Sequence, residues 1–245
     1  MRRGALTTAL RVGAVVVATV PATTQVTAAQ EHSEPRGAWG MSLVAAEPVG
    51  ELAIFFDRGF GGQIDAAWPM SHDGRLRLRS DLGFLVYGYE NLHYCYSVPI
   101  GCRIEADLTT MNNIVYGGLG PEVAFRVGAL EPYAYATAGL SYFATVSSLG
   151  DEWSESDWAE TTNYSDLVMA WKLGGGMRLR VSRGARPVSL DFGVERHRNG
   201  IAAFLTPGDI VDNPDGSITV YPNRSEANLT TFRFGVSMGI GGRRD

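Results

Sequence analysis

The sequence predicts an all-β fold, an eight-stranded antiparallel up-and-down transmembrane β-barrel. Three observations favour it: apolar and polar residues alternate over most of the chain, an apolar N-terminal segment resembles a secretory signal, and short and long connections follow one another in turn. Alternation with a period of two is the pattern of strands with two different faces. A mean hydropathy of −0.04 does not fit a helical membrane protein, whereas a barrel averages an apolar face and a polar face.

Residues 1–29 have the features of a secretory signal peptide. Arg2, Arg3 and Arg11 form a positive region, and the apolar stretch 12–20 is too short to span a bilayer. Small residues at 26–29 supply a cleavage pattern, and a transit peptide or a membrane anchor is the alternative. Removal of this segment would change the formal net charge from −5 to −8. The remaining chain divides into a polar leader at 30–36, the barrel domain at 37–241 and a C-terminal tail at 242–245.

Export also sets the redox environment of the two cysteines. Cys95 and Cys102 are an even pair in a compartment where disulfides persist, so we predict a disulfide that staples a surface loop. A metal site is the weaker interpretation, because there is no further cysteine and the four histidines are scattered. We expect no cofactor and no metal. A sequence pI near 5.4 also argues against a general nucleic-acid binder.

The alternation is clearest over residues 167–181 and is repeated near the C-terminus over 232–240. In the first of these segments Met169 and Trp171 share one face, while Lys172 and Arg178 lie on the other. Several such segments reach the roughly 9–11 residues that a tilted strand needs to cross a bilayer. The eight predicted strands are 38–46, 59–69, 74–89, 103–126, 132–146, 166–182, 187–204 and 229–241.

The connections between these strands fall into two classes. Short turns at 71–74, 128–131 and 183–187 follow the second, fourth and sixth strands. The long links follow the first, third, fifth and seventh strands. In an up-and-down barrel consecutive connections lie at opposite ends, so all the long links share one end. Outer-membrane barrels have this asymmetry, with short periplasmic turns and long extracellular loops, whereas a soluble lipocalin-like barrel, the alternative, has no reason to keep it. The long links are 47–58, 90–102, 147–165 and 205–228.

Residues 37–241 resemble the small bacterial outer-membrane β-barrel superfamily of OmpA-, OmpX- and OmpW-like proteins. The last strand contains Arg-Phe-Gly-Val-Ser-Met-Gly-Ile at 233–240, which is similar to the C-terminal assembly signal of that superfamily. It departs from the signal by ending in Gly-Gly-Arg-Arg-Asp instead of a terminal aromatic residue. The resemblance implies a non-enzymatic protein of the cell outer membrane with a structural or surface-interaction role. Its implied partners are outer-membrane lipid and the barrel-assembly machinery, and the ligand of the loops is left open.

In a membrane barrel the faces rich in Leu, Phe, Val and Met point to lipid, so the opposite faces line the lumen. Eight strands leave an interior that side chains can fill, and buried charges of both signs can pair there. We therefore predict a lumen plugged by paired charges and not an open pore. The predicted lumen charge network consists of Asp65, Arg77, Arg79, Asp81, Glu122, Arg126, Lys172, Arg178, Arg180, Asp191, Glu195 and Arg233.

The sequence leaves two other functions open. One is a narrow channel or a carrier for small hydrophobic molecules, as suggested for OmpW-like barrels. The other is a lipid A-modifying hydrolase, since residues 195–200 loosely resemble the His-x-Ser-Asn stretch of outer-membrane lipid A deacylases. Asn199 occupies the position of the nucleophile two residues after His197, and Ser189 lies roughly 26 Å away along the strand. No catalytic residue is therefore assigned, and His197 and Glu195 are expected to pair at the rim of the lumen.

Overall fold

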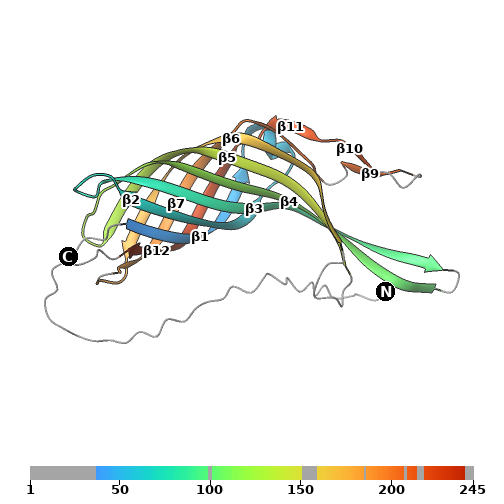
Figure 1. Ribbon diagram of the computed structural model, residues 1–245, viewed down its shortest axis with the longest axis horizontal. Helices are drawn as coiled ribbons and strands as arrows, with labels where there is room; N and C mark the ends of the chain where they lie inside the picture. The colour runs from blue at the N-terminus through green and yellow to red at the C-terminus, as the bar shows by residue number, and fades with distance from the viewer. Residues whose placement is uncertain are drawn as a thin grey trace, which may run out of the picture. The chain divides into compact units, whose positions relative to one another are not determined.

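The eight-stranded antiparallel barrel is confirmed by the computed structural model, which describes residues 37–98, 101–150, 159–184, 186–206, 209–213 and 218–240. The predicted signal peptide, leader and tail lie outside these residues. The closed sheet has the order β1-β12-β7-β6-β5-β4-β3-β2 (Figure 1). Its strands are β1 (Gly37–Pro48), β2 (Gly59–Pro69), β3 (Leu76–Val98), β4 (Gly101–Ala124), β5 (Leu130–Gly150), β6 (Ala159–Arg180), β7 (Val188–Asn199) and β12 (Leu229–Ile240).

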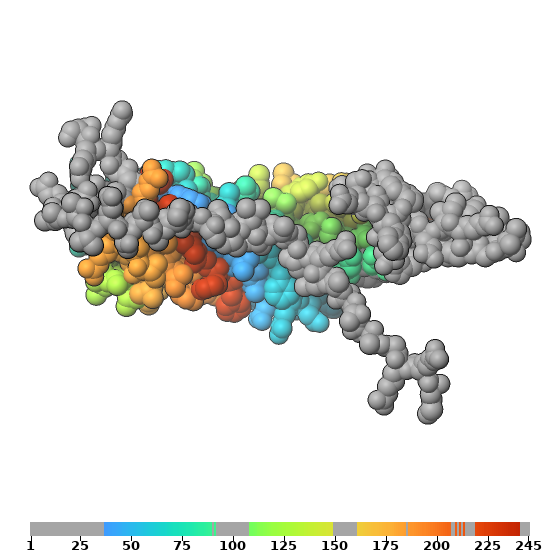
Figure 2. Space-filling model, turned by 90° about the horizontal axis from the view of Figure 1, so that it is seen from below, coloured from blue at the N-terminus to red at the C-terminus, as the bar shows by residue number. Residues whose placement is uncertain are grey.

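The first and last strands close the barrel. They pair antiparallel from Gly37 opposite Ile240 to Pro48 opposite Leu229, so β12 is paired along its whole length. In Figure 2 the red residues of β12 lie directly beside the blue residues of β1. This closure removes the free edges that an open sheet would present.

The three short turns share one backbone device. Each contains a glycine with positive φ: Gly74 at 65°, Gly128 at 64° and Gly184 at 133°. Glycine adopts this conformation without the steric cost that a side chain would incur. In the first turn the Asp73 carboxylate accepts hydrogen bonds from the Ser71 hydroxyl at 2.5 Å and the Arg75 backbone N–H at 3.3 Å, and these bonds lower the pKa of Asp73. We call this end of the barrel the turn end and the opposite end the loop end.

Two of the predicted long links are largely strand, so these predictions are wrong. β3 continues to Val98 and β4 begins at Gly101 within the predicted link 90–102. β5 likewise continues to Gly150 and β6 begins at Ala159, inside the predicted link 147–165. β3 pairs with β2 only as far as Val86, and beyond that point it pairs with β4 alone (Figure 1). Beyond the rim no surface separates lipid from lumen, so the alternation that marks a strand fades while backbone pairing continues.

The predicted disulfide falls in this extended hairpin. The backbone register places Cys95 opposite Glu105 and Cys102 opposite Ser97, on adjacent strands. The side chains of 92–107 lie outside the described part of the structure. The Cys95–Cys102 disulfide therefore stays a prediction.

The other two long links contain short elements of their own. The 3₁₀ helix η1 (Gly50–Ile54) follows β1, and β9 (Ile210–Asp212) pairs with β10 (Ile218–Val220). The predicted strand 187–204 breaks at Gly200, because β8 (Ile201–Phe204) leaves the barrel wall and pairs with β11 (Asn223–Glu226). Figure 1 shows η1, β9, β10 and β11 at the loop end.

The outer surface of the barrel wall is apolar. Over 167–181 the apolar residues of the outer face are all exposed: Leu167, Met169, Trp171, Leu173, Met177, Leu179 and Val181. Trp171 is 66% and Leu173 68% exposed, while Lys172 between them is buried at 2%. Exposed Phe192, Phe232 and Phe234 continue this surface onto β7 and β12. None of the helices in the described part of the chain is long and apolar enough to span a membrane.

Candidate functional site

The barrel interior is the candidate functional site, and it has two parts that follow one another along the strands. On β3, inward-facing Arg79 and Asp81 lie nearer the turn end, and Leu85 and Tyr87 lie nearer the loop end. We call the charged part the charged half. Its buried members are Asp65, Arg79, Asp81, Glu122, Lys172, Arg178, Asp191, Glu195 and Arg233.

Glu122 on β4 is the centre of the charged half. Arg178 on β6 donates two hydrogen bonds to its carboxylate, at 2.8 and 2.9 Å, and Arg79 on β3 donates a third at 2.8 Å. The Arg178 Nε also donates to Asp191 on β7 at 3.3 Å. Charge-assisted, two-pronged contacts of this kind are among the strongest hydrogen bonds in proteins, and they offset the cost of burying the charges.

Three further predicted residues lie at the mouth of the turn end. Arg77 and Arg126 both bind Glu131, at 2.7 and 3.0 Å, and Arg178 reaches the same carboxylate at 3.1 Å. Arg180 is half-buried and lines a cavity of about 400 Å³ at this mouth together with Arg77 and Arg126. Glu131 belongs to the predicted turn 128–131 and was therefore not included in the predicted lumen charge network. The alternation of β5, extended back from Tyr133, puts Glu131 on the inner face.

A second group of charges lies deeper in the barrel. Asp65 on β2 contacts Arg79 at 3.1 Å and Arg233 on β12 at 3.6 Å. Arg233 also lies 3.6 Å from Glu195, and Lys172, the only lysine of the chain, pairs with Asp81. Each of these buried charges therefore has a partner of opposite sign on another strand.

Tyrosines join this network although the sequence did not single them out. The Tyr133 hydroxyl donates to Asp191 at 2.5 Å, and the Tyr135 hydroxyl donates to Glu195. The Arg178 guanidinium lies 4.0 Å from the Tyr133 ring centre, within range of a cation–π interaction. A Cβ on Gly174 would lie 2.5 Å from the Tyr135 ring, so glycine is required on β6 for this ring to fit. Alternation alone did not reveal them, because tyrosine suits either face of a strand.

His197 is more deeply buried than the predicted position at the rim. It does pair with Glu195, through Nε2 at 2.6 Å, but both side chains are almost fully buried. The Thr231 hydroxyl lies 3.3 Å from the same nitrogen, and the Tyr116 ring meets the imidazole edge to face at 4.8 Å. Asn199 occupies the position of the deacylase nucleophile. Its side-chain oxygen accepts a hydrogen bond from the Ser141 hydroxyl, and its side-chain nitrogen donates one to the Ala227 carbonyl.

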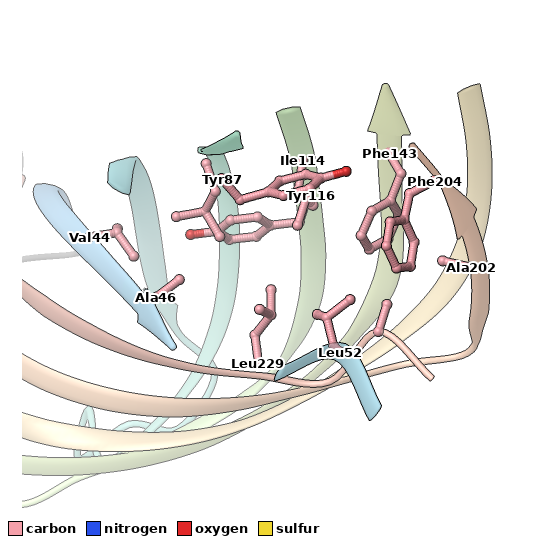
Figure 3. Packing of buried hydrophobic residues seen from close by; sticks show 12 residues of the cluster. Val44, Ala46, Leu52, Tyr87, Ile114, Tyr116, Phe143, Ala202, Phe204 and Leu229 are labelled. Atoms are coloured by element: carbon pink, nitrogen blue, oxygen red, sulfur yellow. The ribbon is translucent and has the colours of Figure 1, made fainter. Parts of the chain in front are cut away.

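The loop half of the interior contains a large apolar cluster beside buried polar residues such as Asn112 and Thr145, so paired charges do not fill the whole lumen as predicted. Here barrel residues pack against side chains of the loop-end elements (Figure 3). The ring centres of Phe143 on β5 and Phe204 on β8 are 6.3 Å apart, and Leu52 of η1 is fully buried. We call this cluster the apolar plug. It consists of Val44, Ala46, Leu52, Leu85, Tyr87, Ile114, Tyr116, Phe143, Ala202, Phe204, Ala227 and Leu229.

The two halves meet at Tyr116 on β4. Its ring belongs to the apolar plug, while its hydroxyl donates to the buried side chain of Gln63 on β2 at 2.9 Å. The Lys172 ammonium lies 4.9 Å from the same ring. Among the described residues, no group of three His, Cys, Asp or Glu side chains is placed to hold a metal ion.

Comparison with known proteins gives distant structural likenesses only. No protein-family model and no curated protein matches the chain. Neisserial surface protein A (NspA) aligns with a TM-score of 0.41 at 14% identity, over 83% of this chain and 96% of that one. Ail, the attachment invasion locus protein of Yersinia pestis, gives 0.39 at 8% identity over 84% and 98%. A major outer membrane protein from Thermus thermophilus gives 0.38 at 14% over 81% and 98%.

The class of protein is therefore defined by the strand pairing of the chain itself. Eight antiparallel strands close on one another, with an apolar outer wall and a filled interior. This is the architecture of a small eight-stranded β-barrel, as the resemblance to the outer-membrane superfamily implied.

Proposed function

We propose that the chain is an integral outer-membrane barrel with a structural or surface-interaction role and no enzymatic activity. The observation that carries this proposal is the reversal of polarity across the wall: exposed Trp171 and Leu173 flank Lys172, which is buried inside. A soluble barrel would hide its apolar face and expose its charges, whereas a lipid-embedded barrel does the opposite. Export by the N-terminal signal and insertion by the barrel-assembly machinery belong to the same proposal.

The filled interior supports a closed lumen. The charged half occupies the turn end of the barrel, and the apolar plug occupies the loop end. Both halves contain large, fully buried side chains, including Arg79, Tyr116 and Phe204. An interior of eight strands is about wide enough for side chains to fill, which supports a lumen that is closed to ions.

Membrane fractionation combined with heat-modifiable gel mobility tests the proposal. We expect the mature chain in the outer-membrane fraction, with a folded band that shifts on boiling. The folded protein should also give no discrete conductance steps in a planar bilayer. Recovery as a soluble monomer without detergent would disprove the membrane proposal, and regular conductance steps would disprove the closed lumen alone.

The apolar plug supports one alternative, a carrier for a small hydrophobic molecule. Its contacts come partly from η1 and β8, which are outside the strand ladder of the barrel. Movement of β8 would break the hydrogen bond from the Ala203 backbone N–H to Asp166 on β6, but no ladder pairing of the wall. Displacement of these elements would expose Tyr87, Ile114 and Phe143 to a ligand. This alternative predicts that a hydrophobic fluorophore binds the folded barrel and that Phe143→Ala changes its affinity. If the fluorophore shows no saturable binding, the carrier alternative is wrong and the structural or surface-interaction role is favoured.

A further inference from the structure

The rim of the barrel at the turn end carries a concentration of arginines. Four arginines lie in the three connections 70–75, 125–129 and 181–187, and Arg180 ends β6 beside the third. Two acidic residues accompany them: Asp73 contacts Arg75 at 3.5 Å, and Glu131 binds Arg126 at 3.0 Å. Arg183 and Arg186 are exposed, and Arg75 has 65% of its side chain exposed. We call this set the turn-end collar; it consists of Arg75, Arg126, Arg180, Arg183 and Arg186.

Apolar side chains stand directly beside these arginines. Phe125 and Val127 flank Arg126 and are 51% and 69% exposed, and Val181 follows Arg180 and is 56% exposed. The apolar outer wall therefore continues up to the collar without a polar gap. Arg126 and Arg180 line the mouth cavity, whereas the exposed Arg183 and Arg186 can extend their stems along the apolar surface and place their guanidinium groups in the headgroup layer.

The loop end does not share this charge pattern. Among the described residues its exposed arginines are Arg58, Arg198 and Arg224, and they are balanced by four exposed carboxylates at the same end, Glu47, Glu51, Asp57 and Glu226. The excess of basic residues is thus specific to one end of the barrel.

We propose that the turn-end collar binds the phosphates of anionic phospholipids in the membrane leaflet at the turn end. This inference rests on the proposed function, because it requires the wall to lie in lipid. A guanidinium matches phosphate oxygens with two parallel hydrogen bonds. The occupant is a lipid and not a free anion, because Phe125, Val127 and Val181 lie where acyl chains would continue below the phosphate.

The collar would also fix the depth and the direction of the barrel in the membrane. Phosphates bound around three turns hold the turn end at the headgroup layer. The mixed charges of the loop end give no such preference. The chain would therefore recruit anionic lipid at one leaflet only.

The test is lipid selection by the folded mature barrel in nanodiscs that contain equal amounts of phosphatidylglycerol and phosphatidylcholine. Native mass spectrometry measures the ratio of the two lipids retained on the protein. We expect the wild type to retain phosphatidylglycerol preferentially. The Arg183→Gln/Arg186→Gln variant should lose about fivefold of this preference for each arginine removed. The matched control, Arg58→Gln/Arg224→Gln, removes the same charge from the loop end and should keep the preference.

Equal losses in the two double variants, or no preference in the wild type, would overturn the inference. Inorganic phosphate that binds the detergent-solubilised barrel with the same dependence on Arg183 and Arg186 would also overturn it, by showing a site for soluble anions. Heat-modifiable mobility in phosphatidylcholine alone is measured first. Failure to fold there counts against the membrane proposal, whereas folding without lipid selection counts against the collar only.

Discussion

In the charged half the contacts run between strands of the barrel wall, as from Arg178 on β6 to Glu122 on β4. In the apolar plug many contacts run from the wall to elements outside it, as from Phe143 on β5 to Phe204 on β8. The two regions fill the same lumen, but they are connected to the fold in different ways. Damage to the charged half should therefore weaken the whole barrel, and damage to the plug should free only the loop end.

The two regions also differ in how they tolerate loss of a partner. An apolar side chain that is truncated leaves a cavity, whose cost depends on how far the neighbours relax. A buried charge that loses its partner stays buried and uncompensated, and this cost is hard to relieve inside a closed barrel.

Glu122→Gln should give the largest effect. It removes the negative charge that Arg79 and Arg178 both contact at 2.8 Å, and both arginines remain buried. Breaking a buried ion pair in this way costs about 3–5 kcal/mol in the free energy of unfolding. Urea unfolding in lipid vesicles, followed by gel mobility, measures the loss. Asp57→Asn, which neutralises an exposed carboxylate, is the control and should change stability by less than about 0.5 kcal/mol. Equal stability of the two variants would contradict the role of Glu122.

Phe204→Ala should act on the apolar plug without unfolding the barrel. Phe204 contacts Phe55, Tyr87 and Phe143, and its loss costs up to about 3–5 kcal/mol in a well-packed core. Because β8 pairs with β11 and not with the wall, this loss should appear as faster amide hydrogen exchange in 201–204 and 223–226. The barrel amides of β7 and β12 serve as the internal reference. Uniformly faster exchange over the wall would mean that the two halves are not independent.

The two-residue period of the strands decides which interior residues can be predicted from the sequence. Alternation alone places Asp65, Asp191 and Arg233 on the inner face, because within a strand the face of each residue is set by its parity. It cannot place Leu52 or Phe204, whose partners are chosen by tertiary contact after the chain has left the wall. The residues of the charged half can therefore largely be predicted from the sequence, whereas those of the apolar plug cannot.

The wall offers a sharper test of the same polarity. Leu173→Arg puts a charge on the lipid face, where the cost is about 2–4 kcal/mol near the bilayer midplane. The position is 68% exposed, so packing inside the barrel is unaffected. Folding yield and urea stability in vesicles report the effect, and Leu173→Met is the control of similar size and polarity. Full stability of Leu173→Arg in lipid would place this surface in water and not in a membrane.

The smallest effect is expected outside the membrane-spanning wall, at Asp73 in the first short turn. The Ser71 hydroxyl and the Arg75 backbone N–H lower the pKa of Asp73 below its usual value. A carboxyl whose pKa is lower when folded stabilises the fold above its unfolded pKa, and the contribution disappears as pH falls through the folded pKa. The site is fully exposed, so Asp73→Asn should leave global stability at neutral pH nearly unchanged. An NMR titration should give an Asp73 pKa below that of an unstructured peptide, and Ser71→Ala should raise it. An unshifted Asp73 pKa in the folded protein would contradict the two hydrogen bonds to this carboxylate. It would not bear on the charged half or the apolar plug, which lie inside the barrel.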